Sequence, residues 1–163
     1  MTGTRIAIGC DHAAVSLKDE IVAWLKEGGA TVEDVGTHSG QPVDYPDPAA
    51  AVASRVASGA ADRGIVLCGT GIGVSIAANK IPGIRAALCH DVTTARLASQ
   101  HNDASVLCLG ARTTGQTVAL NIVETWLVTP FEAGRHAVRV EKIRSLEARA
   151  GATGVTVKGG SGR

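Results

Sequence analysis

Short apolar runs rich in valine and isoleucine alternate along this chain with segments long enough to form helices. The runs are hydrophobic almost throughout, rather than at every second position, which is typical of strands that are covered on both faces. Because a helical segment separates each run from the next, we expect a parallel α/β sheet. The pattern predicts five strands, at Arg5–Gly9, Ala30–Val35, Gly64–Leu67, Ile84–Leu88 and Ser105–Leu109.

The segments between the predicted strands show the spacing of amphipathic helices. In the first, an apolar stripe from Val15 to Leu25 is followed by two glycines that supply a helix stop. A final charged segment, Arg135–Arg149, retains a few apolar residues and suits a helix that lies across a surface or a partner subunit. Similar patterns predict helices at about 47–59, 72–79, 92–101 and 115–128.

Length and composition favour one domain. The 163 residues are 45% hydrophobic, which is enough for a single core of ordinary size. We expect this domain to span residues 1–150. Residues 151–163 are small, polar and rich in glycine, so we expect them to form a disordered tail.

The charge balance argues against several classes of partner. The formal net charge is +1, from 16 basic and 15 acidic residues without a long basic block, so nothing favours binding to nucleic acid or to an anionic membrane. No apolar run approaches the ~18 residues that span a bilayer, and the N-terminus lacks the pattern of a secretory signal. We therefore expect a cytoplasmic protein, whose four cysteines form no Cys-x-x-Cys pair and are reduced.

The candidate chemistry lies in the segments that follow the strands. In an open parallel sheet, ligands bind beyond the carboxyl ends of the strands, where loops and helix N-termini gather. Three predicted strands are followed there by reactive side chains, in Gly9–His12, Cys68–Gly73 and Cys89–Asp91. Since the strands are expected to be parallel, all three segments can meet at one edge of the sheet.

The most informative of these segments is Cys68–Gly73, which has glycine at alternate positions. Such a loop lets backbone N–H groups approach a ligand oxygen closely. Its spacing matches neither the phosphate loop nor the dinucleotide glycine pattern, which disfavours a nucleotide site. At the head of the loop, Cys68 can act as a thiolate base. The alternative is that Cys68 is a small buried hydrophobe, as most strand cysteines are.

Other candidates allow two interpretations each. His101, beside Asn102 and Asp103, can carry protons near neutral pH, or it can simply end the fourth helix. Asp11 and His12 share this ambiguity, because an aspartate after a strand is often only a helix cap. No pair of residues has the spacing of a zinc site, so we predict no metal. Four basic residues could bind a phosphate, namely Arg112, Arg135, His136 and Arg139. The alternative is that they are only solvated, as most surface arginines are.

Seven segments taken together resemble the type B ribose-5-phosphate isomerases. The match covers about residues 4–149 and is far more specific than any single motif. The same family also contains allose-6-phosphate and galactose-6-phosphate isomerases. The segments are Gly9–His12, Asp44–Pro46, Cys68–Lys80, Gly83–Ala86, Gln100–Asp103, Leu109–Arg112 and Gly134–His136.

The resemblance implies a three-layer α/β/α, Rossmann-like fold and an aldose–ketose isomerase that interconverts ribose 5-phosphate and ribulose 5-phosphate without a cofactor. The family has two catalytic versions, one with a cysteine at the position of Cys68 and one with a glutamate in place of Ser75. This chain resembles the cysteine version. The resemblance also implies a homodimer with shared active sites, which in some members assembles into a homotetramer.

The resemblance further assigns roles to individual residues. Cys68 would move a proton between C2 and C1 through a cis-enediolate, His101 would open the sugar ring, and Thr70 would assist near the ring. Backbone N–H groups of the loop, at Gly69, Gly71, Ile72 and Gly73, would stabilise the enediolate oxygen. Substrate contacts would come from Asp11 and Asn102 at the sugar hydroxyls, from Tyr45 in the pocket wall, and from His12, Arg112, Arg135 and Arg139 at the phosphate.

Several alternatives stay open. The substrate could be another phosphorylated aldose, such as a tetrose, allose or galactose phosphate, because loop 36–46 is expected to help set the length of the pocket but does not reveal it. A non-catalytic module that binds sugar phosphates is disfavoured by the joint presence of Cys68 and His101. A thiol redox protein is disfavoured by the lack of a Cys-x-x-Cys pair.

Overall fold

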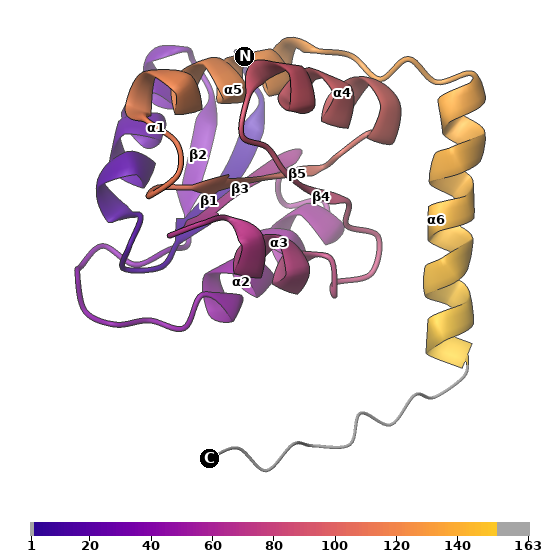
Figure 1. The fold of residues 1–163 in the computed structure, drawn as a ribbon, viewed down its shortest axis with the longest axis horizontal. Coiled ribbons are helices and arrows are strands. Elements are labelled where there is room, and N and C mark those ends of the chain that lie inside the picture. Colours follow the sequence, from indigo (N-terminus) through magenta and orange to yellow (C-terminus); the bar gives the residue numbers. More distant parts are fainter. Residues whose placement is uncertain (1, 153–163) are drawn as a thin grey trace.

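The computed structural model describes residues 2–152, the last three by backbone alone, and contains one five-stranded, all-parallel sheet (Figure 1). The strand order is β2-β1-β3-β5-β4. This arrangement confirms the predicted parallel α/β sheet. The strands are β1 (Arg5–Cys10), β2 (Thr31–Asp34), β3 (Arg63–Cys68), β4 (Ala86–Leu88) and β5 (Val106–Gly110).

Helices cover both faces of the sheet, which confirms the three-layer, Rossmann-like arrangement. Figure 1 shows α1, α4 and α5 on one face and α2 and α3 on the other. The helices are α1 (Val15–Glu27), α2 (Pro46–Ala57), α3 (Ile72–Ala78), α4 (Val92–Asn102), α5 (Gln116–Val128) and α6 (Arg135–Ala152). None of the described helices is long and apolar enough to cross a membrane.

Two hydrophobic cores lie between the layers. Successive strand residues point to opposite faces, so Ile6 and Ile8 enter the core beneath α1 and α5, while Ala7 enters the core beneath α2. Trp126 of α5, the largest fully buried side chain among the described residues, belongs to the first core. Both faces of the central strands are therefore buried, which explains their continuous hydrophobicity.

The last helix, α6, stands beside the domain rather than on a face of the sheet (Figure 1). Its first turns pack against α4, and further along Glu147 accepts a hydrogen bond from the Gly83 N–H at 3.0 Å. Val138, Ile143 and Leu146 remain exposed on it. The helix ends at Ala152, two residues into the predicted tail, and the rest of that tail, residues 153–163, lies outside the described residues.

The direction of α4 decides where its last turn lies. The helix begins beyond the carboxyl end of β4 and ends just before the amino end of β5, so it runs antiparallel to the strands. The last turn of α4 and the first turn of α6 are thus at the amino edge of the sheet. The loop after β3 is at the carboxyl edge, because Cys68 pairs with Gly110 at the end of β5. A five-residue strand, about 16 Å long, separates the two edges.

Candidate active site

The glycine-rich loop after β3 is folded around the sulfur of Cys68. The backbone N–H of Gly71 donates a hydrogen bond to Cys68 Sγ at 3.1 Å. Gly71 has φ = 77°, a left-handed conformation that disfavours side chains, and a Cβ there would collide with Leu88 and with the backbone of Leu109. This donor belongs to the loop, because Gly71 is the residue that precedes α3. The arrangement favours a sulfur that accepts hydrogen bonds, as a thiolate does.

The other three cysteines are held as neutral thiols. Burial raises the pKa of Cys10 to about 12 and that of Cys89 to about 11, and it raises the pKa of Cys108 further still. Cys10 and Cys89 donate weak hydrogen bonds to backbone carbonyls, whereas Cys68 accepts one. This difference separates Cys68 from its companions, which sequence composition could not do.

Two side chains close around the loop. The Arg112 N–H donates to the Gly69 carbonyl at 2.9 Å, and the arginine side chain lies against Gly69. On the other side, the ring of Tyr45 faces Gly73 so closely that a Cβ on this glycine would lie 2.5 Å from the ring. The predicted residues Thr70 and Ile72 belong to the same turn, where the Thr70 hydroxyl accepts from the Ile72 N–H at 3.3 Å, and Ile72 begins α3.

Asp11 and His12 follow β1, which lies beside β3. The Asp11 N–H donates to the Leu67 carbonyl, and its buried carboxylate accepts from the Ala13 N–H at 2.9 Å. His12 accepts from the Val43 N–H through Nδ1 at 3.2 Å, so its neutral ring carries the proton on Nε2. Both predicted residues therefore lie at the same edge of the sheet as Cys68.

Sequence reasoning missed Lys18, whose side chain is fully buried. Its Nζ lies 2.6 Å from Asp34 Oδ2, 3.1 Å from the Thr37 carbonyl and 3.3 Å from His38 Nδ1. These contacts anchor the start of loop 36–46, which leads to Tyr45. A usable signal was present, because Lys18 lies three residues before Ile21 on the apolar face of α1.

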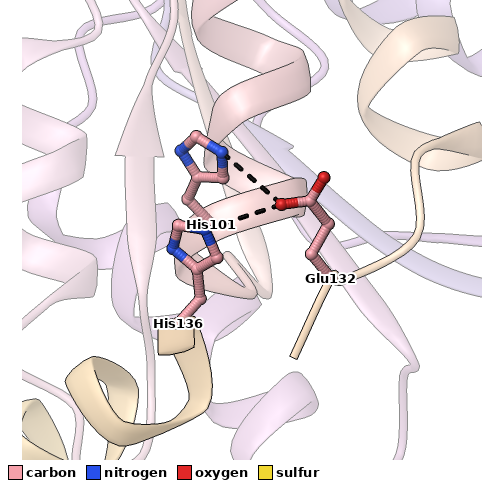
Figure 2. Close-up of side chains that lie close together, drawn as sticks. All are labelled: His101, Glu132 and His136. Atoms are coloured by element: carbon pink, nitrogen blue, oxygen red, sulfur yellow. Dashed lines mark ion pairs between the residues drawn. The ribbon is translucent and has the colours of Figure 1, made fainter. Parts of the chain in front are cut away.

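A second group of predicted residues lies at the amino edge. The rings of His101 and His136 are stacked, with centroids 4.1 Å apart, and Glu132 Oε2 lies 3.8 Å from Nε2 of the first and 3.5 Å from Nε2 of the second (Figure 2). Arg135 Nε donates to His136 Nε2 at 3.3 Å. Asn102 ends α4 beside His101, and Arg139 lies on the next turn of α6.

The structure thus divides the predicted site into two halves that one chain does not bring together. No sequence pattern pointed to Glu132, which lies in the irregular linker between α5 and α6. The carboxyl-edge half contains Asp11, His12, Tyr45, Cys68, Gly69, Thr70, Gly71, Ile72, Gly73 and Arg112, and the amino-edge half contains His101, Asn102, Arg135 and Arg139.

The segment Cys89–Asp91 belongs to neither half. It is at the carboxyl edge, but β4 is separated from β3 by β5. Asp91 caps α4 by accepting the Thr94 N–H at 2.8 Å, and Cys89 is buried. Asp91 therefore acts as the N-cap of α4.

Among the described residues, two side-chain groups have the composition of a metal site. One consists of His101, Glu132 and His136, but the two rings are parallel to within 5°, so their in-plane lone pairs cannot converge on one ion. The other consists of Asp19, Asp34 and His38, and the Lys18 ammonium already forms ion pairs with both of its aspartates. The parallel rings of the first group and the ion pair within the second do not fit a metal ion.

A cleft of about 400 Å³ lies between α6 and the edge strand β4. Its walls are mainly aliphatic, including Ile84, Ile143 and Leu146. Three of its polar residues have hydrogen-bond partners: Asn79 bonds Ala86, Arg85 bonds the end of α4, and Glu147 accepts from the Gly83 N–H. Of the predicted site residues, Asn102 lines this cleft, whereas Cys68 and its loop do not.

Comparison with known proteins gives concordant results. A family model described as Ribose/Galactose Isomerase matches residues 6–143. The ribose-5-phosphate isomerase B of Escherichia coli is 51% identical over 89% of this chain and 97% of its own length. A D-erythrulose-4-phosphate isomerase of Pectobacterium atrosepticum is 48% identical over 87% of this chain and 94% of its own length. The structure of ribose-5-phosphate isomerase B from Mycoplasma genitalium with bound ribulose-5-phosphate superposes with a TM-score of 0.87 at 41% identity, covering 91% of this chain and 99% of that one.

Proposed function

Because the chain belongs to the ribose/galactose isomerase family, we propose that it is an aldose–ketose isomerase that interconverts ribose 5-phosphate and ribulose 5-phosphate. The observation that carries the proposal is the Gly71 N–H directed at Cys68 Sγ, in the glycine-rich loop that leads from β3 into α3. A carbon next to a carbonyl loses a proton readily only where the resulting enolate oxygen is stabilised. The loop places the base and such donors side by side.

In this mechanism the Cys68 thiolate removes the C2 proton of the open-chain aldose. The electron pair of the C–H bond forms the C1–C2 double bond of a cis-enediolate, and the former carbonyl oxygen takes the negative charge. Backbone N–H groups of the loop from Gly69 to Gly73 stabilise that oxygen. The thiol then returns the proton to C1, while the hydroxyl proton moves from O2 to O1, which leaves the ketone at C2. No electron leaves the sugar, so the reaction needs no cofactor.

The division of the site implies that two chains build it. Cys68 and His101 lie at opposite edges of the sheet in one chain, so a reaction that uses both requires a second copy. We propose a homodimer with twofold symmetry, in which each site combines the carboxyl edge of one subunit with the amino edge of the other. Apolar side chains exposed near each edge fit this interface, namely Tyr45, Ile72 and Ile76 on one side and Val138, Ile143 and Leu146 on the other.

Within such a site, His101 opens the furanose ring and Asn102 binds a sugar hydroxyl, opposite Asp11. Thr70 assists near the ring, and Tyr45 lines the pocket. The phosphate dianion pairs with His12 and with arginines from both halves, because guanidinium groups bind phosphate through charge-assisted hydrogen bonds. These arginines are Arg112, Arg135 and Arg139. Phosphorylated sugars are anionic metabolites that cells retain, so we propose that the enzyme works in the cytoplasm.

A shorter substrate is the second candidate, because a relative at 48% identity is named a D-erythrulose-4-phosphate isomerase. Measurement of kcat/KM for tetrose, pentose and hexose phosphates separates the two. We expect the pentose phosphate to be preferred. A preference of about tenfold or more for a tetrose or hexose phosphate would replace the proposed substrate without changing the chemistry.

The test of the cysteine mechanism is Cys68→Ala, with Cys89→Ala as a matched control. Cys68 is the last residue of β3 and Cys89 directly follows β4, and both are buried, but only Cys68 adjoins the glycine loop. We expect Cys68→Ala to lower kcat by at least about 10²-fold, the usual contribution of a positioned base, and to abolish exchange of the C1 proton of ribulose 5-phosphate with solvent. Unchanged exchange in this variant would refute the mechanism.

A further inference from the structure

Glu132 is fixed to the end of α4 by two contacts with one residue. Its backbone N–H donates to the Gln100 carbonyl at 3.0 Å, and its Oε1 accepts a short hydrogen bond from the Gln100 side-chain amide. Gln100 immediately precedes His101. The linker between α5 and α6 is therefore tied down where it passes the histidine, and one carboxylate oxygen is already engaged.

The second oxygen, Oε2, faces both histidine rings (Figure 2). His136 is buried, and its Nε2 accepts from Arg135 Nε. Its pKa is lowered by burial and by the groups that face it, which are His101 on α4 and Arg135 and Arg139 on α6. The Glu132 carboxylate raises this pKa but does not outweigh them. His136 thus remains a neutral ring stacked on its neighbour.

With His136 neutral, the carboxylate of Glu132 is available to His101. Its Oε2 lies 3.8 Å from His101 Nε2, an ion-pair distance that shortens readily in a substrate complex. Figure 2 shows the other ring nitrogen, Nδ1, on the side of the ring away from the carboxylate. A carboxylate on one nitrogen of an imidazole orients the ring and stabilises the charged form that donates a proton from the other nitrogen.

We propose that Glu132 is a positioning residue for ring opening, which holds His101 through Nε2 so that Nδ1 faces the furanose of the substrate. This inference rests on the proposed function. In the step, the Nδ1 proton passes to the ring oxygen as the C1–O bond breaks, and the proton released by the C1 hydroxyl restores His101. The neutral His136 ring, stacked on the His101 ring, helps to hold His101 in this orientation.

The two halves of the reaction can be measured separately, which tests this role. Ribose 5-phosphate is mostly a closed furanose, so its conversion needs ring opening. Ribulose 5-phosphate carries its phosphate on O5 and stays open, so entry of deuterium from D₂O at its C1 requires only the Cys68 step. For Glu132→Gln we expect kcat for ribose 5-phosphate to fall about tenfold or more, while deuterium entry stays within about twofold of wild type.

Two further variants sharpen the test. Glu132→Asp keeps the charge and should recover part of the lost kcat, and Glu141→Gln removes a surface carboxylate of α6, paired with Arg144, and should change neither measurement. Equal losses in both measurements for Glu132→Gln, or no loss in either, would overturn the inference. The failure of the proposed function would look different, because deuterium would then enter at C1 equally well with Cys68→Ala.

Discussion

Substitution of Gly71 by alanine probes the loop that surrounds Cys68. Alanine at φ = 77° is strained, and its Cβ would collide with Leu88 and with the backbone of Leu109. The left-handed conformation costs about 1–2 kcal/mol and overpacking about 1–3 kcal/mol, so about 2–5 kcal/mol would be lost if the loop kept its shape. A loop can relieve this cost by moving, but the Gly71 N–H then leaves Cys68 Sγ. By analogy with the loss of one donor to an oxyanion, we therefore expect loss of this donor to the sulfur to lower kcat by about 10²–10³-fold.

The matched control is Gly59→Ala. Gly59 has φ = 74°, almost the same backbone conformation, but nothing lies within 4 Å of the position of its Cβ, and it is remote from the loop. This variant should lose only the strain of about 1–2 kcal/mol, seen as a fall in Tm of about 2–8 °C, with kcat unchanged. Initial rates with ribose 5-phosphate and thermal unfolding curves measure both effects. If Gly71→Ala kept the kcat of Gly59→Ala, the loop geometry would not be what activates Cys68.

Other consequences follow from single contacts. Iodoacetamide at neutral pH should modify Cys68 before the other three cysteines, whose thiols burial keeps protonated, and peptide mass spectrometry would show the order. Lys18→Met should lower the free energy of unfolding, measured by urea titration, by about 3 kcal/mol, because it leaves the Asp34 carboxylate without its ion-pair partner. The double variant with Asp34→Asn should recover part of this loss. The pKa of His136 is lowered in the folded state, so the unfolded chain binds its proton more readily and stability should fall as pH drops through about 6.5. His136→Gln should flatten that dependence, and an unchanged slope would contradict the burial of a neutral ring.

The hydrophobic pattern predicted all five strands, because strands buried on both faces leave a continuous apolar run. The pattern predicted the ends of β4 and β5 less accurately, because there residues outside the apolar run take part in strand-like hydrogen bonding. β4 begins at Ala86 rather than at Ile84, and there the side chain of Asn79 bonds both the N–H and the carbonyl of Ala86 as a neighbouring strand would. β5 includes Gly110, which pairs with Cys68 although it adds nothing to the apolar run.

The candidate site was predictable where it depended on strand ends. Asp11 follows β1 and Cys68 ends the adjacent parallel strand β3, so topology alone brings them together. The position of His101 follows from the direction of α4, which must return to the amino edge before β5 can begin. Glu132 could not be found in this way, because a linker without periodic structure carries no pattern that fixes where its side chains point.

The central claim is that each active site takes Cys68 from one subunit and His101 from the other. The measurement that tests it is the activity of a heterodimer of Cys68→Ala and His101→Ala chains, isolated through two different tags. Such a dimer has one site with both residues intact and one with neither, so we expect about half of the wild-type kcat per dimer, although each parent homodimer is inactive. If Cys68 and His101 of the same chain formed the site, both sites would be defective and the heterodimer would be as inactive as its parents.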